Sequence, residues 1–239
     1  MMDFNMVPWG QAMWNTPTCG VLDTSTYVWG SFWDGYDANA RICYDVACGA
    51  DADQFFGQGK ADCFNKTLGP LCQHGGAECA VNAIQACSKK LSGNDWTQYG
   101  PFAVCFEEHY ADIQSPKGAT ASSNYSQNRT LAEPAINATT STCANGTKFK
   151  VEELLSCFYN SEVEMLAEMA KSTVPHVSVP FVRIKQCNGS WNILGLGDGI
   201  PPSDLLIDAV CAASCEGSKA AQKCQALPHN KSKTDMVYT

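Results

Sequence analysis

The chain has 239 residues, a formal net charge of −8 and an isoelectric point near 4.9, and 45% of its residues are hydrophobic. This length and composition suffice for one large domain or two small ones with a substantial core. Because the sequence has no run of Lys or Arg, nucleic acid and anionic membranes are not expected partners. No apolar run approaches the roughly 20 residues of a membrane-spanning helix, so no membrane span is expected.

The fourteen cysteines are the strongest compositional feature. An even number, spread over most of the chain, is typical of disulfides formed in an oxidising compartment. The spacing alone leaves the pairing open. We expect disulfides at Cys19, Cys43, Cys48, Cys63, Cys72, Cys79, Cys87, Cys105, Cys143, Cys157, Cys187, Cys211, Cys215 and Cys224.

Seven Asn-x-Ser/Thr sequons without an intervening Pro independently indicate the secretory pathway. They begin at Asn65, Asn124, Asn128, Asn137, Asn145, Asn188 and Asn230. Four of these sequons cluster within residues 115–147, a stretch rich in Ser, Thr and Asn, which predicts a glycosylated surface loop. The first residues of the sequence have neither the basic start nor the apolar core of a signal peptide.

The first seventy residues combine a short predicted strand, Phe4–Val7, with a longer segment at 13–70 that is rich in Cys, Gly, Asp and aromatic residues. This composition disfavours a regular helix and suggests a small core of its own, in which four cysteines could form two bridges. The Asp-x-Asp pair at 51–53 is not followed by the ligand and the glycine of a calcium loop, so no metal site is expected.

A helix is predicted from Glu78 to Leu91, because apolar residues recur on one face at three- and four-residue steps. Three cysteines, one His and one Glu lie at or near its start. A zinc site would place its ligands in pairs two to four residues apart, so disulfides are the simpler interpretation. His74 is then expected to form hydrogen bonds at the helix entry, with a catalytic role as the alternative.

The same stretch resembles the hallmark C-Q-H-G-x2-E-C-x2-N-x4-C of the gamma-interferon-inducible lysosomal thiol reductase (GILT) family. Every fixed position of this motif is present: Cys72, Gln73, His74, Gly75, Glu78, Cys79, Asn82 and Cys87. Residues 7–12 also resemble a segment that precedes the motif in the family. The resemblance implies an α/β thioredoxin-like fold, no bound cofactor, and reduction of protein disulfides.

Two further helices are predicted in the middle of the chain. Residues 96–114 show helical periodicity, with His109 on the apolar face, where a hydrogen-bonded core histidine is expected. Residues 150–171 show the same periodicity, with an interruption at 160–161. In the thioredoxin-like fold that the resemblance implies, residues 72–170 form a mainly helical insertion.

The C-terminal part begins with a predicted strand at 181–184. The sequence before it resembles the family strand that opens with a cis-proline beside the redox cysteines, and by position this residue is Pro180. Residues 191–202, rich in Gly and Pro, predict a turn, and residues 203–213 predict a helix with a Ser at its start. Residues 226–239 form a polar tail.

A thiol reductase needs a thiolate of lowered pKa and a second thiol within reach, which a Cys-x-x-Cys at a helix start provides. The sequence contains no Cys-x-x-Cys, and the nearest spacings, Cys211-x3-Cys215 and Cys43-x4-Cys48, are interpreted as structural. In the family, the redox pair precedes the segment matched at the start of this chain. We therefore expect an N-terminally truncated form that lacks the first strand and the redox-motif helix, and we assign no catalytic residue.

The sequence thus predicts one thioredoxin-like domain of the GILT type over 1–225, with an insert at 13–70. The expected function is thiol–disulfide oxidoreduction of disulfide-containing protein substrates, in an acidic endosomal or lysosomal compartment or outside the cell. Two alternatives remain. One is a redox-inactive thioredoxin-like binding module, and the other is a secreted disulfide-rich structural glycoprotein.

Overall fold

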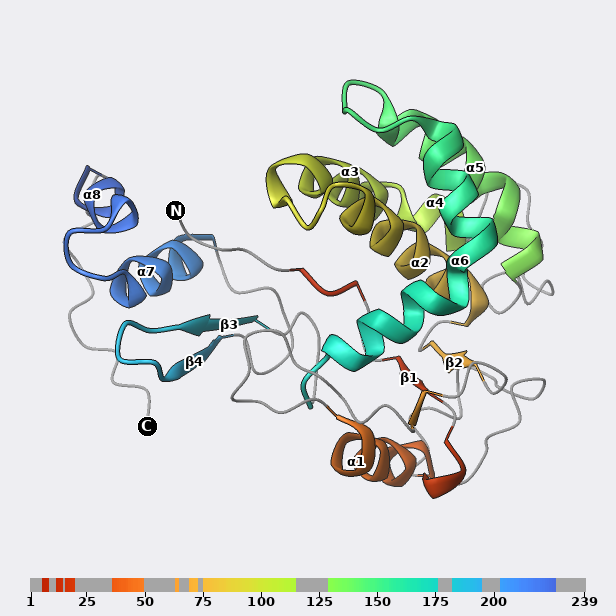
Figure 1. Ribbon diagram of the computed structural model, residues 1–239, viewed down its shortest axis with the longest axis horizontal. Coiled ribbons are helices and arrows are strands. Elements are labelled where there is room, and N and C mark those ends of the chain that lie inside the picture. Colours follow the sequence, from red (N-terminus) through yellow and green to blue (C-terminus); the bar gives the residue numbers. More distant parts are fainter. Residues whose placement is uncertain are drawn as a thin grey trace. The chain divides into compact units, whose positions relative to one another are not determined.

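The computed structural model describes residues 6–8, 12–14, 16–19, 36–49, 63–64, 69–72, 75–114, 129–175, 182–194 and 203–226. The chain divides into a larger unit, Phe4–Val179, and a smaller unit, Pro180–Thr239 with Met1–Asp3. The described part is mostly helical, and its strands form two small antiparallel pairs (Figure 1). It fits the expected α/β class only loosely.

The larger unit begins with two short strands and ends with a set of packed helices. Its elements are β1 (Met13–Trp14), the 3-10 helix η1 (Pro17–Cys19), α1 (Tyr36–Cys48), β2 (Pro70–Leu71), α2 (Gly76–Leu91), α3 (Trp96–Glu108), α4 (Tyr110–Gln114), α5 (Arg129–Ala144) and α6 (Val151–Ser172). Strands β1 and β2 pair antiparallel, with Met13 opposite Leu71.

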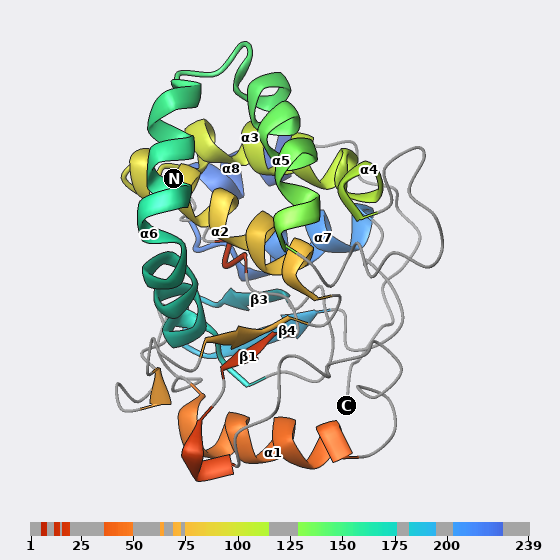
Figure 2. The same ribbon diagram turned by 90° about the vertical axis from the view of Figure 1, so that its right-hand side faces the viewer.

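Helix α2 lies at the centre of the larger unit, between α5 and α6 (Figure 2). Every residue from Ala77 to Lys89 is buried, so the helix has almost no solvent-facing side. Close packing of a helix buried all round favours small residues, and α2 has an alanine at every third position from Ala77 to Ala86. It also buries polar side chains, among them Glu78 and Lys89. The predicted helix at 78–91 is confirmed, with two more residues at its start.

The core around α2 is rich in aromatic rings. Phe102 and Phe106 of α3 and Phe158 of α6 are fully buried. The ring centroids of Phe102 and Phe106 lie 4.9 Å apart, and the ring of Phe149 meets Phe102 edge-on at 5.6 Å. Full burial of such a side chain contributes about 1.5–3 kcal/mol, so these rings are a main source of stability for the helical unit.

Two helices occupy the segment where the sequence predicts one. Helix α3 ends at Glu108 and α4 begins at Tyr110, and the N–H of His109 between them is shared by the carbonyls of Cys105 and Phe106. The predicted core position of His109 is wrong, because its side chain is 40% exposed. The break changes the direction of the chain, so that α4 packs against α2 and α5 and buries Ile113.

The predicted loop at 115–147 is wrong over residues 129–144, because these residues form α5. Residues 115–128 lie outside the described part. Ser and Thr are poor helix formers because their hydroxyls compete for backbone groups. In α5 the hydroxyls of Thr140, Ser141 and Thr142 instead donate to the carbonyl four residues earlier, at 2.8, 3.0 and 3.1 Å. Packing against α2, α3 and α6 outweighs the low intrinsic propensity.

The composition of residues 13–70 predicts no regular helix. This prediction is wrong, because the segment contains helix α1. The helix itself contains no glycine, and two disulfides hold it, Cys19–Cys43 and Cys48–Cys63. The prediction that the four cysteines of this segment form two internal bridges is confirmed.

The smaller unit consists of a β-hairpin and two helices: β3 (Val182–Lys185), β4 (Trp191–Leu194), α7 (Ser203–Ala213) and α8 (Lys219–Ala226). The predicted strand at 181–184 corresponds to β3, whereas residues 191–194 form β4 rather than the predicted turn. The turn lies earlier, where Gly189 has a φ of 87° and the N–H of Gln186 donates to the carbonyl of Ser190 at 2.8 Å.

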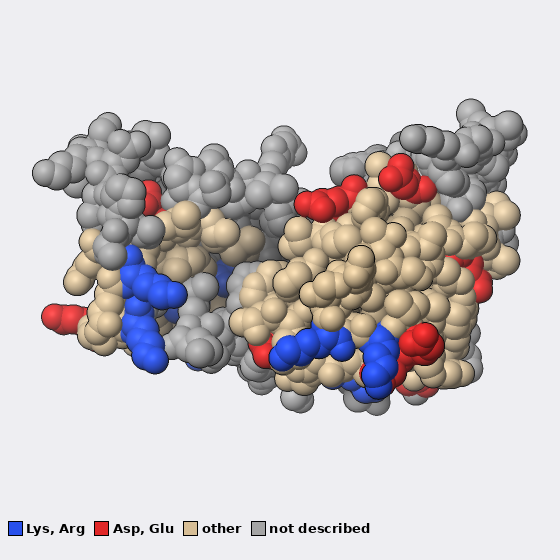
Figure 3. All heavy atoms as spheres, turned by 90° about the horizontal axis from the view of Figure 1, so that it is seen from above, with Lys and Arg blue, Asp and Glu red and all other residues tan. Residues whose placement is uncertain are grey.

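The surface carries both signs of charge in small groups. Figure 3 shows that, on one face, Lys and Arg side chains lie close to Asp and Glu side chains in small groups. Uncharged residues lie between these groups. Among the described residues, no helix combines the length and the hydropathy that a membrane crossing requires.

Candidate functional site

The motif segment, residues 72–87, connects β2 to the central helix α2. Between them the chain turns at Gly75, whose N–H donates to the carbonyl of Cys72 at 3.1 Å. Gly75 has a φ of 87°, in the left-handed region that a residue with a side chain rarely adopts. The glycine of the motif therefore has a backbone reason. Gln73 and His74 lie outside the described residues.

The three cysteines of the motif segment brace α2 at both ends. Cys72 and Cys79 are bonded to each other across the helix entry, with 5.6 Å between their Cα atoms. Cys87 is bonded to Cys157 of α6, 70 residues further along the chain. All three motif cysteines are buried, which hinders attack by an incoming thiolate. The segment is thus a structural brace in the described state.

The polar motif residues are buried with the cysteines. Glu78 is 7% exposed and Asn82 is 8% exposed. Nearby, burial raises the pKa of Tyr110, and the negative charges of Glu78 and Glu107 raise it further. Tyr110 therefore stays protonated and accepts a hydrogen bond from Nε2 of Gln114 at 2.7 Å. Tyr110 and Gln114 are themselves only partly buried, so this polar group lies at the margin of the helical core.

The N-terminal stretch of the larger unit is fastened to this helical part at Met6. The Nζ of Lys89, in α2, donates to the carbonyl oxygen of Met6 at 2.7 Å. The N–H of Met6 donates to the hydroxyl of Tyr99, in α3, at 3.1 Å. Burial lowers the pKa of Lys89 to about 8. Because Lys89 is a buried side chain in the motif helix, its contact with Met6 fixes the preceding chain against α2.

All fourteen cysteines lie within the described residues, and all are paired, so the expected disulfides are confirmed. The other bonds join Cys105 to Cys143, Cys187 to Cys215, and Cys211 to Cys224. Cys43 is not bonded to Cys48, and Cys211 is not bonded to Cys215, although these are the most closely spaced pairs in the sequence. Neither pair therefore acts as a redox disulfide here.

The comparison with known families decides what the motif segment represents. Residues 53–123 match the model of the family described as Gamma interferon inducible lysosomal thiol reductase (GILT). We call residues 53–123 the GILT segment, because this stretch is similar to the family. This range includes the complete motif and the helices α2 and α3, so the resemblance is confirmed there. No curated protein and no solved structure significantly matches the chain.

One cluster of potential metal ligands lies at the edge of the GILT segment. Within the described part of the chain, a ring nitrogen of His109 and the sulfurs of Cys105 and Cys143 lie within 4.8 Å of one another. The two sulfurs are bonded to each other, so His109 is the one free ligand of the three. The cluster is better described as a half-exposed imidazole beside a disulfide. Sequence reasoning missed it because Cys143 reaches His109 only when α5 packs against α3.

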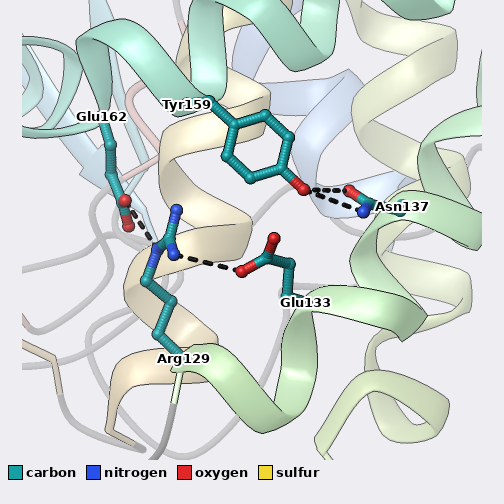
Figure 4. Close-up of polar contacts among 5 residues, drawn as sticks. All are labelled: Arg129, Glu133, Asn137, Tyr159 and Glu162. Carbon is teal, nitrogen blue, oxygen red and sulfur yellow. Dashed lines mark hydrogen bonds and ion pairs between the residues drawn. The ribbon is translucent and has the colours of Figure 1, made fainter.

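A second polar cluster joins α5 to α6 outside the GILT segment (Figure 4). The Nε of Arg129 lies 2.7 Å from Oε2 of Glu162, and its Nη1 lies 3.3 Å from Oε2 of Glu133. The guanidinium also stacks 4.8 Å from the ring centroid of Phe158. Burial raises the pKa of Glu162, and the charge of Arg129 opposes this shift. The positive charge of Arg129 is neutralised by the two carboxylates. The ion pairs hold α5 beside the kink of α6 at Ser161.

The smaller unit holds the other predicted site residue. Pro180 lies outside the described residues, two positions before β3 begins. On the hairpin itself, the guanidinium of Arg183 lies 4.2 Å from the ring centroid of Trp191. This cation–π contact connects β3 to β4 and stabilises the hairpin that follows Pro180.

Proposed function

We propose that the protein acts in thiol–disulfide chemistry of the GILT type, on disulfide-containing protein substrates. The observation that carries this proposal is the GILT match at residues 53–123, which coincides with the braced central helix of the larger unit. The motif is long, and its glycine and all three of its cysteines have defined structural roles. A chance match of a short pattern would not produce this agreement.

The proposed fold is thioredoxin-like, with α2–α6 as a helical insertion. The order of elements in the smaller unit supports it, because a thioredoxin fold closes with an antiparallel hairpin followed by a helix, as in β3, β4 and α7. Helix α7 packs against β3. Pro180, two positions before this hairpin, is proposed as the proline that faces a redox disulfide.

The proposed setting is an acidic endosomal or lysosomal compartment, or the cell exterior. Seven disulfides fit an oxidising compartment. Sequons in exposed turns, at Asn145 and Asn188, are also expected of a protein that enters the secretory pathway.

A redox-inactive binding module is the second candidate, and one observation favours it. The 239-residue sequence contains no Cys-x-x-Cys, and every cysteine is consumed in a disulfide. A scaffold of this kind would hold a disulfide-containing polypeptide without reducing it, since reduction requires a free thiolate.

Reduction of insulin at pH 4.5–5 in the presence of a small thiol donor separates the two candidates. Turnover above that of the donor alone supports the oxidoreductase. Absence of turnover, combined with binding of oxidised insulin in preference to its reduced and alkylated chains, supports the binding module. If the protein shows neither turnover nor preferential binding, both candidate functions are overturned. Protein with all seven disulfides reduced and alkylated is the matched control, because it lacks the bonds that brace the fold.

A further inference from the structure

Three of the sequons lie in the described part of the chain, and their surroundings differ. An N-glycan is attached when the side-chain nitrogen of Asn, assisted by the hydroxyl two residues later, attacks a lipid-linked oligosaccharide. The acceptor must therefore offer an accessible amide and a chain that can bend around it. A helix interior offers neither, whereas an exposed turn offers both.

Asn188 lies in the turn between β3 and β4 and is exposed. Its Oδ1 accepts hydrogen bonds from both the N–H and the hydroxyl of Ser190, at 2.9 and 2.7 Å. This is an Asx turn that brings the sequon hydroxyl against the acceptor amide. Gly189 between them has a φ of 87°, which suits the tight bend. The folded hairpin thus presents the sequon in a bent, accessible form.

Asn145 lies in the turn that joins α5 to α6 and is also exposed. Figure 1 shows this turn projecting beyond the ends of both helices. The following residue is again a glycine with positive φ, Gly146 at 79°. The hydroxyl of Thr147 donates to the carbonyl of Ala144 at 2.7 Å, so this sequon is accessible but less completely arranged than the one at Asn188.

Asn137 differs from both, because it lies within α5 and its amide is already engaged. Its Nδ2 donates to the hydroxyl of Tyr159, in α6, at 2.8 Å, and its Oδ1 lies 3.0 Å from the same hydroxyl (Figure 4). Thr139, which would supply the assisting hydroxyl, is buried at 8% exposure. The pair lies at the surface, since Tyr159 is 44% exposed, so a glycan on Asn137 would have to break this contact rather than enter the core.

We propose that oligosaccharides are attached at Asn188 and Asn145, and that Asn137 stays unmodified to pair with Tyr159. In each attachment, Nδ2 forms a bond to C1 of an oligosaccharide carried by a polyprenyl pyrophosphate. The bond from C1 to the pyrophosphate oxygen breaks, the lipid pyrophosphate leaves, and Nδ2 loses one proton to the transferase. The proposal does not depend on whether the protein reduces disulfides.

Asn-Gly pairs also deamidate, because a glycine lets the next backbone nitrogen attack the side-chain carbonyl. Both proposed acceptors are Asn-Gly pairs, so the test must separate the two reactions. Enzymatic removal of an N-glycan converts Asn to Asp with an oxygen atom from the solvent. If this step is run in heavy-oxygen water, glycosylated sites acquire the heavy label, whereas earlier deamidation leaves unlabelled Asp. Label that appears in the same incubation without the enzyme reports deamidation during the step and is subtracted.

The full chain, directed into the endoplasmic reticulum of eukaryotic cells by a cleavable leader, would be treated with peptide N-glycosidase in heavy-oxygen water and mapped by mass spectrometry. We expect heavy label at Asn188 and Asn145 and none at Asn137. Label at Asn137, or a peptide containing Asn188 that is unmodified or carries unlabelled Asp, would overturn the proposal. As matched controls, Asn188→Gln and Asn145→Gln should each remove one glycan on a gel, and Asn137→Gln should remove none. The map of the unsubstituted chain decides the question even if a variant fails to fold.

Discussion

The ammonium group of Lys89 lies inside the helical unit and donates to the main-chain oxygen of Met6 at 2.7 Å. Only 5% of this residue is exposed to solvent, and desolvation lowers its pKa from 10.5 to about 8. The contact therefore fastens the N-terminal stretch to α2 at the expense of burying a charge. Because the hydrogen bond and the buried charge have opposite effects on stability, the net effect of Lys89 depends on pH.

The first prediction concerns the alkaline side of the stability curve. Between pH 8 and about 10.5 the unfolded chain retains the Lys89 proton that the folded protein has lost, so the free energy of unfolding should rise with pH. The size of the effect is at most about 3.5 kcal/mol, since one pKa unit corresponds to about 1.4 kcal/mol. Denaturant titrations of the wild type and of Lys89→Met across this range would measure it.

Lys89→Met should flatten the rise that is due to this residue, whereas the exposed neighbour substitution Lys90→Met should leave it in place. An identical pH dependence in the wild type and Lys89→Met would show that the buried ammonium does not control alkaline stability.

The second prediction compares two disulfides of the motif segment. Replacement of both Cys87 and Cys157 by Ala opens a loop of 70 residues, and chain entropy predicts a loss of about 4 kcal/mol. Replacement of Cys72 and Cys79 opens a separation of 7 residues, for which the same reasoning gives about 2 kcal/mol. Thermal and denaturant unfolding of the two double variants would give the order, and a reversed order would mean that local packing at the helix entry outweighs loop closure.

The third prediction concerns two adjacent glycines that receive the same substitution. Gly75→Ala places a side chain at a φ of 87° and should cost about 1–3 kcal/mol of stability. Gly76→Ala adds an alanine to the first position of α2 and should be neutral or stabilising by up to about 1 kcal/mol. Equal effects of the two substitutions on the unfolding midpoint would contradict the assigned backbone geometry.

The fourth prediction tests the cluster between α5 and α6. In Arg129→Met, Glu162 loses the charge that opposes the rise of its pKa, so its folded-state pKa should increase further. A carboxyl whose pKa is raised by folding destabilises the protein above its unfolded pKa, and this penalty disappears as pH falls. The loss should therefore be about 1–3 kcal/mol at pH 7, discounted because the pair is partly exposed, and smaller near pH 4.

Lys150→Met is the matched control, because it breaks an ion pair with Glu153 in which both side chains are more than half exposed. It should change stability much less than Arg129→Met at pH 7, because solvent screens an exposed ion pair. A loss for Arg129→Met that is the same at pH 4 and pH 7 would show that Glu162 does not depend on the guanidinium.

Patterns that are complete within one element were predictable from the sequence. The apolar repeat of α2, and the interruption of α6 at Ser161, both appear in the structure. Helix α5 was missed because its Ser and Thr residues predict a loop by propensity, and the neighbours that stabilise it come from other helices. Strand β4 was missed because Trp191–Leu194 becomes a strand only through its pairing with β3.

The residues of the candidate site also fall into two groups, those that the sequence predicts and those that it does not. The motif segment could be found from the sequence because its residues are consecutive. The imidazole of His109 beside the Cys105–Cys143 bond, and the pairing of Arg129 with Glu162, depend on contacts between helices. Their partners are determined by tertiary packing, which a periodicity argument does not contain.

The bond between Cys87 and Cys157 encloses the bond between Cys105 and Cys143 within its loop. During synthesis the ribosome delivers Cys105 and Cys143 before Cys157. The inner bond can therefore close first, while Cys87 waits as a thiol close to Cys72 and Cys79. Maturation then requires either protection of Cys87 until α6 has been made or later correction by a disulfide isomerase. The central helix that stabilises the finished protein is thus also the point at which its oxidative assembly can go wrong.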